Sequence, residues 1–248
     1  MAPEAWPAAL TRYVSERLQC EPELFARPGA HLVVAHRPRL RVWQFAIPLW
    51  LMVFERAAVV SVAPELAAAV KHLLHAAAWH ELLDDAVMES LRRLIVHWGP
   101  ADWFRRALWL YCTPEMFAPH CVAEVVSVPP DHPEGKAARA RHRGEVFGVF
   151  RGRELISRSS IKTESDAAWE VAVTTTEQYR RRGLGASVVS RATEFILAQG
   201  KPALYHCEVT NEASRRLAES LGYRLFAREL AWSVDARWVP WFWGESAK

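Results

Sequence analysis

A turn with two glycines, at residues 180–185, joins a predicted strand at residues 169–175 to a predicted helix at residues 183–199. The first turn of a helix presents backbone N–H groups without partners and the positive end of the helix dipole. Gly183 and Gly185 would let a phosphate approach those N–H groups closely, so the turn predicts a pyrophosphate cradle. It lacks the Lys-Ser/Thr pair of the nucleoside-triphosphate loop and the glycine spacing of the dinucleotide fingerprint. Taken alone, it fits equally a surface turn in front of an amphipathic helix.

Strand and helix signals continue to alternate on both sides of this turn. Residues 203–209 predict a strand and residues 213–221 a short helix, followed by an extended run at residues 223–234. Upstream, residues 145–150 and 155–161 flank a glycine-containing turn, which is typical of a β-hairpin. The pattern indicates an α/β (α+β) fold class.

The first hundred or so residues predict a separate α/β accessory domain, so the expected domains are residues 1–116 and residues 117–248. Helical spacing of apolar side chains alternates there with short apolar runs. The predicted helices span residues 7–20, 64–78 and 82–98, and the predicted strands span residues 31–36, 43–54 and 57–62. The last two strands are close enough to form a hairpin.

Two segments of the C-terminal half together carry a family resemblance. Arg180, Gly183 and Gly185 form the pattern Arg-x-x-Gly-x-Gly, and a second pattern runs from Asn211 to the Leu-Gly-Tyr sequence at residues 221–223. Their order resembles the GCN5-related N-acetyltransferase (GNAT) superfamily without a break over residues 169–223. The resemblance implies a mixed central sheet flanked by helices. It also implies an N-acetyltransferase that moves an acetyl group from acetyl-CoA to a primary amine.

The resemblance further implies where acetyl-CoA, the co-substrate, would bind. The strands at residues 169–175 and 203–209 would splay apart and pair their backbone groups with the pantetheine arm. Amides of the glycine turn would hold the pyrophosphate, and the arginines would complement its charge. The implied cofactor-binding residues are Val173, Thr174, Thr175, Arg180, Arg181, Arg182, Gly183, Leu184, Gly185, Ala186, Asn211 and Ser214. Asn211 also fits a helix cap, because it stands just before the short helix.

Transfer to an amine requires the removal of a proton, because an amine with a pKa of about 10.4 is almost fully protonated at pH 7. A general base close to the ammonium group would lower this barrier. Many members of the superfamily carry a catalytic glutamate on the strand at residues 169–175, which makes Glu170 the first candidate. Glu208, on the neighbouring strand, is the second. The alternative role for Glu170 is that of a solvated strand residue or a salt-bridge partner.

The proton for the departing thiolate has no assigned donor in this sequence. Many relatives place a tyrosine four residues before the glycine of the Leu-Gly-aromatic motif, and here that position is Ala218. Tyr223 is expected to pack. Cys207 is not expected to act as a nucleophile, because the adjacent His206 should point to the opposite face of the sheet. Direct attack of the amine on the thioester is therefore the expected mechanism.

The acceptor side departs from the superfamily pattern. Residues 121–128 predict a strand, whereas residues 129–144 are rich in proline and basic residues without periodicity and predict a loop. Two helices usually stand at this point in the superfamily and shape the acceptor pocket. We therefore expect the N-terminal domain to supply a wall of the pocket.

Composition limits the partners. A formal charge of +3 is small, and the basic clusters at residues 136–143 and 180–182 lack interleaved aromatic residues, so a nucleic-acid partner is not expected. The four cysteines have no paired spacing, so no metal is expected. No secretory signal is visible, and the apolar run at residues 45–54 is too short to span a membrane. These features predict a cytoplasmic protein without a membrane partner.

The expected acceptor is a small-molecule amine or an amino group of a peptide or protein. The apolar residues 238–243 would dock on the N-terminal domain or on a second subunit, which leaves a homodimer open. A competing class is a binding module that keeps acetyl-CoA and has lost turnover, and Ala218 favours that class.

Overall fold

The computed structural model describes residues 6–35, 45–76, 78–95 and 103–235 of the chain. The chain forms two compact units, each made of two separate stretches of sequence. The first unit comprises Met1–Tyr13 and Trp109–Leu225, and the second comprises Val14–Leu108 and Phe226–Lys248. The expected domain boundary between residues 116 and 117 stays a prediction, because the grouping of the chain into compact units does not test which segment folds independently. None of the helices in the described part of the chain has the length and apolar character needed to cross a membrane.

The second unit is built on a sheet with the strand order β1-β3-β2-β10. These strands are β1 (Gly29–Val34), β2 (Phe45–Val53), β3 (Ala57–Val62) and β10 (Arg224–Asp235). β2 and β3 form the predicted antiparallel hairpin, β10 runs antiparallel to β2, and β1 runs parallel to β3. The helices of this unit are α2 (Ala67–Ala76), α3 (Asp85–Ile95) and the second half of α1 (Ala8–Leu18), whose first half belongs to the first unit. Single 3-10 turns lie at Pro22–Phe25, Pro64–Leu66 and Trp79–Glu81.

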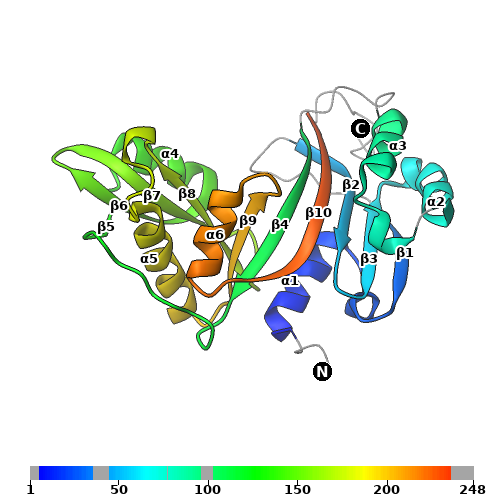
Figure 1. Cartoon of the computed structure of the whole chain (residues 1–248), viewed down its shortest axis with the longest axis horizontal. Helices are drawn as coiled ribbons and strands as arrows, with labels where there is room; N and C mark the ends of the chain where they lie inside the picture. Colours follow the sequence, from blue (N-terminus) through cyan, green and yellow to red (C-terminus); the bar gives the residue numbers. More distant parts are fainter. Residues whose placement is uncertain (1–5, 36–44, 77, 96–102, 236–248) are drawn as a thin grey trace, which may run out of the picture. The chain divides into compact units, whose positions relative to one another are not determined.

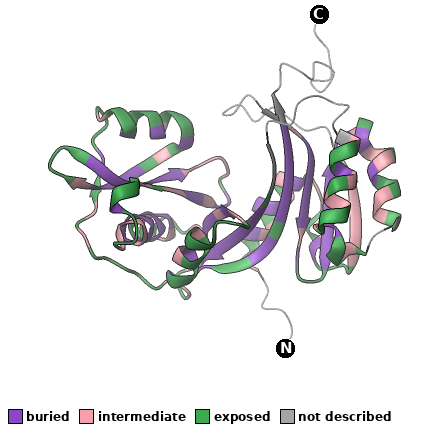
Figure 2. Ribbon diagram, turned by 45° about the horizontal axis from the view of Figure 1, so that its top comes forward, coloured by how far each residue is buried: buried purple, intermediate pink, exposed green. Residues whose placement is uncertain are grey.

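An apolar core joins this sheet to the segment that contains α2 and α3. Leu51, Val60 and Trp232 from the strands and Leu66 and Leu82 from the helical segment are nearly inaccessible to solvent. Figure 2 shows buried strands in this unit, while the outer faces of α2 and α3 are exposed. The predicted helix at residues 64–78 begins with a 3-10 turn at Pro64, where a proline costs no hydrogen bond.

The first unit holds all the residues of the resemblance, and its strands follow the order β9-β8-β7-β6-β5 (Figure 1). The strands are β5 (Val126–Ser127), β6 (Arg143–Arg151), β7 (Glu154–Lys162), β8 (Trp169–Thr175) and β9 (Ala203–Glu208). β5 to β8 are antiparallel neighbours, and β8 and β9 are parallel because α5 (Leu184–Ala198) forms the crossover between them. α6 (Glu212–Ser220) follows β9. The expected mixed sheet flanked by helices is confirmed.

Two helices cover opposite faces of this sheet. Val188 of α5 packs with Val149 of β6 and with Ile156 of β7. On the other face, Ala138 of α4 (Pro133–His142) packs with Val146 of β6. The alternation of side chains along β6 assigns Val146 and Val149 to these two layers.

Helix α4 corrects the prediction of a loop at residues 129–144. Its sequence has little apolar periodicity, because the helix touches the sheet through small residues rather than through large apolar ones. A Cβ on Gly135 would lie 2.6 Å from Val128 Cγ1, which shows how closely the helix approaches the β5 segment. Polar contacts complete the attachment: Arg139 donates to the carbonyl of Val128 at 2.5 Å, and Arg158 of β7 pairs with Glu134 at 3.4 Å.

One strand prediction was also wrong, and one strand of the structure was not predicted. The strand expected at residues 121–128 is reduced to Val126–Ser127, because the preceding residues bind the serine side chains of α5 instead of a neighbouring strand. A strand at Trp103–Cys112, β4, was not predicted. Its sequence contains adjacent arginines and an apolar end, which conceals the alternation of a half-buried strand.

Candidate functional site

Strands β8 and β9 are paired only at their beginnings. Trp169, Glu170 and Val171 face Ala203, Leu204 and Tyr205, and the pairing goes no further, although both strands continue. The expected splaying of the two strands is therefore present. It opens beside the start of α5, which follows β8 in the sequence.

The backbone of β8 presents hydrogen-bonding groups to this opening. The amide of Thr176 donates to Ile156 on the β7 side at 2.9 Å, and the amide of Trp169 donates to Pro202 on the β9 side at 3.4 Å. Because successive amides of a strand alternate in direction, those of Val173 and Thr175 point towards β9. The pairing with β9 has already ended at these residues, so they can bind an extended ligand as an additional strand would.

The loop between β8 and α5 has an unusual backbone. Arg181 has a φ of 58° and Gly183, the N-cap of α5, has a φ of 75°. No side chain caps the first turn of α5. The amides of Leu184, Gly185 and Ala186 lie in that first turn, and such amides are available to an anion.

A strap at residues 118–122 lies against the start of α5. The amide of His120 donates to Ser190 Oγ at 2.9 Å, and the amide of Val122 donates to Ser187 Oγ at 3.0 Å. A Cβ on Gly183 would lie 2.8 Å from Val122 Cγ2, so the glycine is needed for this close approach as well as for its backbone conformation.

Gly185 lies where three elements of the site converge. A Cβ there would be 3.2 Å from Leu217 Cδ1 of α6, 3.4 Å from Thr175 Oγ1 and 4.0 Å from Val173 Cγ2 of β8. A larger side chain at this position would therefore project towards the residues that border the opening. The side chain of Thr174, the remaining predicted strand residue, is exposed.

Asn211 and Ser214 belong to the start of α6. Asn211 Oδ1 accepts the amide of Ser214 at 3.1 Å, which confirms the helix-cap role of Asn211. Ser214 Oγ is 2.8 Å from the hydroxyl of Tyr205, on the last β9 residue that pairs with β8. Burial raises the pKa of Tyr205 to about 12, so this hydroxyl keeps its proton at neutral pH.

Glu170, the first candidate base, is buried and forms an ion pair with Lys162 of β7. The salt-bridge role considered for this residue is thus real, and its role as a base stays a prediction. Glu208, the second candidate, is half-buried at the end of β9, where its carbonyl accepts the amide of Asn211 at 2.9 Å.

His142, at the end of α4, lies near this ion pair. Its Nδ1 is 2.7 Å from Ser160 Oγ of β7, and the residue is buried. Burial, together with the charges of Lys162, Arg141 and Arg158, lowers the pKa of His142 to about 4, while Glu170 acts in the opposite direction.

This histidine predicts a loss of stability in acid. Between its unfolded pKa of 6.5 and its folded value of about 4, the unfolded chain binds a proton that the folded chain does not. The contribution is fully present above pH 6.5 and is lost as the pH falls towards 4, by about 3 kcal/mol. Urea unfolding of the wild type and His142→Asn at pH 7 and pH 4.5 measures it. The variant should lose less stability than the wild type, and parallel losses would contradict the assignment.

The remaining candidates behave as packing groups. Ala218 and Tyr223 are buried, and the Tyr223 hydroxyl lies 2.6 Å from Thr193 Oγ1. Burial raises the pKa of Cys207, which disfavours the thiolate that nucleophilic attack requires. His206 stacks on Trp109 with ring centroids 4.5 Å apart. In the described part of the chain, no group of His, Cys, Asp or Glu side chains is arranged to hold a metal ion.

Part of the chain is similar to a known protein family. Residues 146–233 match the family model described as FR47-like protein, which is a domain of the GNAT type. The resemblance seen in the sequence is confirmed for these residues, about a third of the chain. No curated protein matches the chain.

Solved structures with a similar backbone fold include several GNAT proteins. A GCN5-related N-acetyltransferase from Kribbella flavida is 18% identical, with 92% of this chain and 96% of that chain covered and a TM-score of 0.49. A GCN5-related N-acetyltransferase-like protein from Streptococcus suis 89/1591 is 15% identical, with 90% and 99% covered and a TM-score of 0.47. A GNAT-family protein from Novosphingobium aromaticivorans DSM 12444 is 22% identical, with 54% of this chain and 66% of that chain covered and a TM-score of 0.47. TM-scores below 0.5 add no weight to the family match.

Several residues near the site were not found from the sequence. Lys162 and His142 are distant in sequence from the glycine turn, and nothing in their local pattern marks them. Tyr205 and Tyr179 look like ordinary apolar strand and turn residues, and only their hydrogen bonds to Ser214 and to Glu154 identify their positions.

Proposed function

We propose that this protein transfers an acetyl group from acetyl-CoA to a primary amine. The observation that carries the proposal is the parting of β8 and β9 after Val171, directly beside the uncapped first turn of α5. One end of the site offers backbone groups for an extended arm, and the other end offers amides for a pyrophosphate. The family match of residues 146–233 supports the same reaction class.

In this proposal, Val173 and Thr175 would pair with the pantetheine arm through their backbone groups. The amides of the first turn of α5 would bind the pyrophosphate. The amine nitrogen would attack the thioester carbonyl carbon, the C–S bond would break, and the thiolate would leave with a proton. Glu170 is proposed to accept the proton of the attacking ammonium group, with Glu208 as the second candidate.

The proton for the thiolate would come from water or from a hydroxyl at the opening. Ala218 carries no proton to donate. Ser214 and Tyr205 form a hydroxyl pair where β8 and β9 part, and the raised pKa of Tyr205 keeps that group protonated. This pair supports turnover as opposed to the competing class of a silent acetyl-CoA-binding module. A thiol-release assay over a panel of amines distinguishes the two classes.

Replacing Gly185 by leucine tests the proposed site. Gly185 lies inside α5, where leucine is the better helix former, so the change should not weaken the helix. The new side chain would lie among Thr175, Val173 and Leu217 and displace the ligand. We expect calorimetric titration to show acetyl-CoA binding weakened at least roughly tenfold, because charge-assisted contacts to the amides are lost.

A matched control is available at the other end of the same helix. Ala198 is exposed there, so Ala198→Leu adds similar bulk without reaching the site, and its affinity for acetyl-CoA should equal that of the wild type. Equal affinity of Gly185→Leu and Ala198→Leu would contradict the proposed location. Absence of acetyl-CoA binding to the wild type would contradict the proposed function itself.

A further inference from the structure

The second unit contains a pocket between helix α3 and strand β4. It has a volume of about 330 Å³ and is lined by Asp85, Met88, Glu89 and Arg92 of α3 and by Arg106 of β4. The four helix residues follow the spacing i, i+3, i+4 and i+7, which places them along one face of α3. All five residues belong to the second unit, so the pocket is formed within one compact part of the chain.

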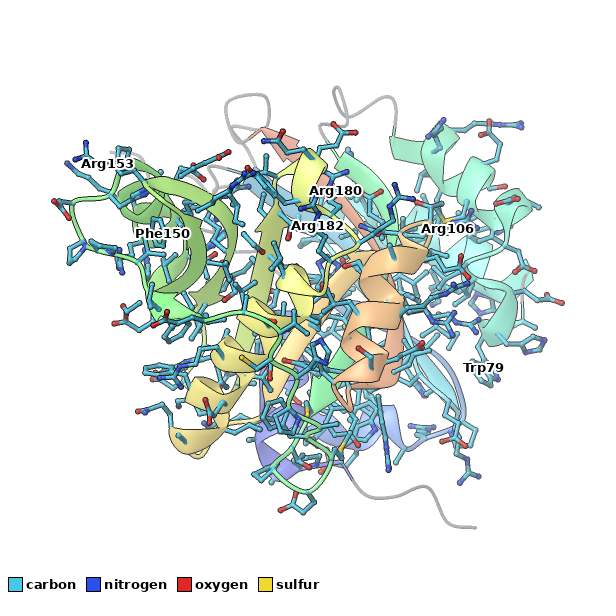
Figure 3. All side chains as sticks on the ribbon, turned by 60° about the vertical axis from the view of Figure 1, so that its left-hand side comes forward. Trp79, Arg106, Phe150, Arg153, Arg180 and Arg182 are labelled. Carbon is cyan, nitrogen blue, oxygen red and sulfur yellow. The ribbon has the colours of Figure 1, made fainter. Side chains whose placement is uncertain are left out.

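Arg106 is held in place by one nitrogen of its guanidinium group. Its Nη1 donates to the carbonyl of Leu83 at 3.1 Å and pairs with Asp85 Oδ1 at 3.0 Å, and Figure 3 shows the residue next to α3. In the described part of the chain, Arg106 makes no other hydrogen bond or ion pair, so Nε and Nη2 keep their N–H groups for a ligand. Two neighbouring N–H groups of a guanidinium match the two oxygens of a carboxylate.

The negative charges of the pocket come from Asp85 and Glu89, which lie one helical turn apart. The side chain of Asp85 is 90% exposed, and Glu89 pairs at 3.1 Å with Arg93, which is also exposed. Such exposed ion pairs contribute little to stability, and a carboxylate accepts more than one hydrogen bond. Both carboxylates can therefore accept hydrogen bonds from an ammonium group without losing their present partners.

The balance of charge decides which class of ligand suits the pocket. Two carboxylates and two guanidinium groups line it, so their formal charges cancel. A ligand of one sign would meet as much repulsion as attraction, whereas a zwitterion can place each of its charges beside an opposite one. Met88 packs against the apolar core of the unit and gives the pocket an apolar, adaptable surface. The lining therefore suits a small zwitterion that also carries an apolar group.

We propose that this pocket binds a free amino acid with an apolar side chain. Arg106 binds its carboxylate, and Asp85 and Glu89 bind its ammonium group. Met88 contacts its side chain. A peptide terminus carries only one of the two charges next to its side chain, so the pocket favours the free amino acid over a peptide. The inference does not rest on the proposed function, because none of these residues belongs to the proposed acetyl-CoA site.

Calorimetric titration of L-leucine into the full-length protein, without acetyl-CoA, tests the inference. A ligand of this size is expected to bind with a Kd of about 0.1–1 mM. Leucine amide lacks the carboxylate and N-acetylleucine lacks the ammonium group, so each should bind at least roughly tenfold more weakly through the loss of charge-assisted hydrogen bonds. Equal affinity for leucine and either derivative would overturn the inference, and so would the absence of leucine binding to the wild type.

Two variants assign the contacts. Arg106→Gln should weaken leucine binding at least roughly tenfold and remove the preference for leucine over leucine amide. Glu89→Gln should remove the preference for leucine over N-acetylleucine, and it leaves the contacts of Arg106 intact. Lys71→Gln is the matched control, because Lys71 is exposed on α2 outside the pocket, and it should keep the affinity of the wild type. Unchanged preferences in the two variants, or an equal loss in the control, would overturn the inference and leave the proposed function intact.

Discussion

Gly222→Ala should lower the free energy of unfolding by about 3–5 kcal/mol. Gly222 has a φ of 90°, and a Cβ there would lie 1.8 Å from the carbonyl oxygen of Met116 and 2.8 Å from its carbonyl carbon. Both atoms belong to the backbone, so no rotamer change relieves the clash. The amide of Ala118 donates to the carbonyl of Leu221 at 3.0 Å, which holds the two segments together.

Gly200→Ala separates the clash from the backbone strain. Gly200 has a φ of 70°, and a Cβ there would meet no atom within 4 Å. Its substitution should therefore cost only about 1–2 kcal/mol. Urea unfolding of the two variants measures both losses of stability. Equal losses would show that the backbone at Met116 shifts to accommodate the new methyl group, and would contradict this prediction. Because the strap at residues 118–122 continues from this contact to Gly183, Gly222→Ala should also weaken acetyl-CoA binding.

Glu170→Gln should reduce both stability and turnover. The Glu170 and Lys162 side chains are 7% and 18% exposed, so removing the carboxylate leaves a largely buried ammonium group without its counter-charge. Breaking such a pair costs about 3–5 kcal/mol. If Glu170 is the general base, kcat should fall by a further factor of about 10²–10⁴ beyond any loss of folded protein.

Lys162→Gln and the double variant distinguish the two effects. Lys162→Gln breaks the same ion pair and keeps the carboxylate, so it should lower stability and retain most of kcat per folded molecule. The double variant removes both charges and should regain part of the stability without regaining kcat. Equal losses of kcat in Lys162→Gln and Glu170→Gln would assign the pair a structural role and leave Glu208 as the candidate base.

Local patterns were sufficient for the segment that carries the site. Residues 169–223 follow the predicted order of strand, turn, helix, strand and helix, with boundaries close to those observed. The glycines were informative because their effect is local: Gly183 adopts the positive φ that the turn requires, and Gly185 leaves room between β8 and α6. The β6–β7 hairpin was equally evident from its alternation around Gly152.

Helix α4 and strand β4 were not predictable in the same way. α4 has a polar sequence and is stabilised by contacts of Gly135 and Arg139 with Val128, just after β5, and of Glu134 with Arg158 of β7. Intrinsic propensity is a weak guide where such tertiary contacts decide. The observed helix also changes the expectation for the acceptor side, since a helix and not a loop covers this face of the sheet.

The sequence by itself determined the order of strand, glycine turn and helix on which the proposed site rests, because each of these depends on residues close together in the chain. Only the tertiary structure decided that Glu170 is paired with Lys162 and that Tyr205 meets Ser214. It also decided that the turn at Arg151 joins the loop at Arg182 through one tyrosine ring. These contacts join residues from different elements. The spacing of residues within one element does not predict which side chains of other elements they will contact in the folded protein.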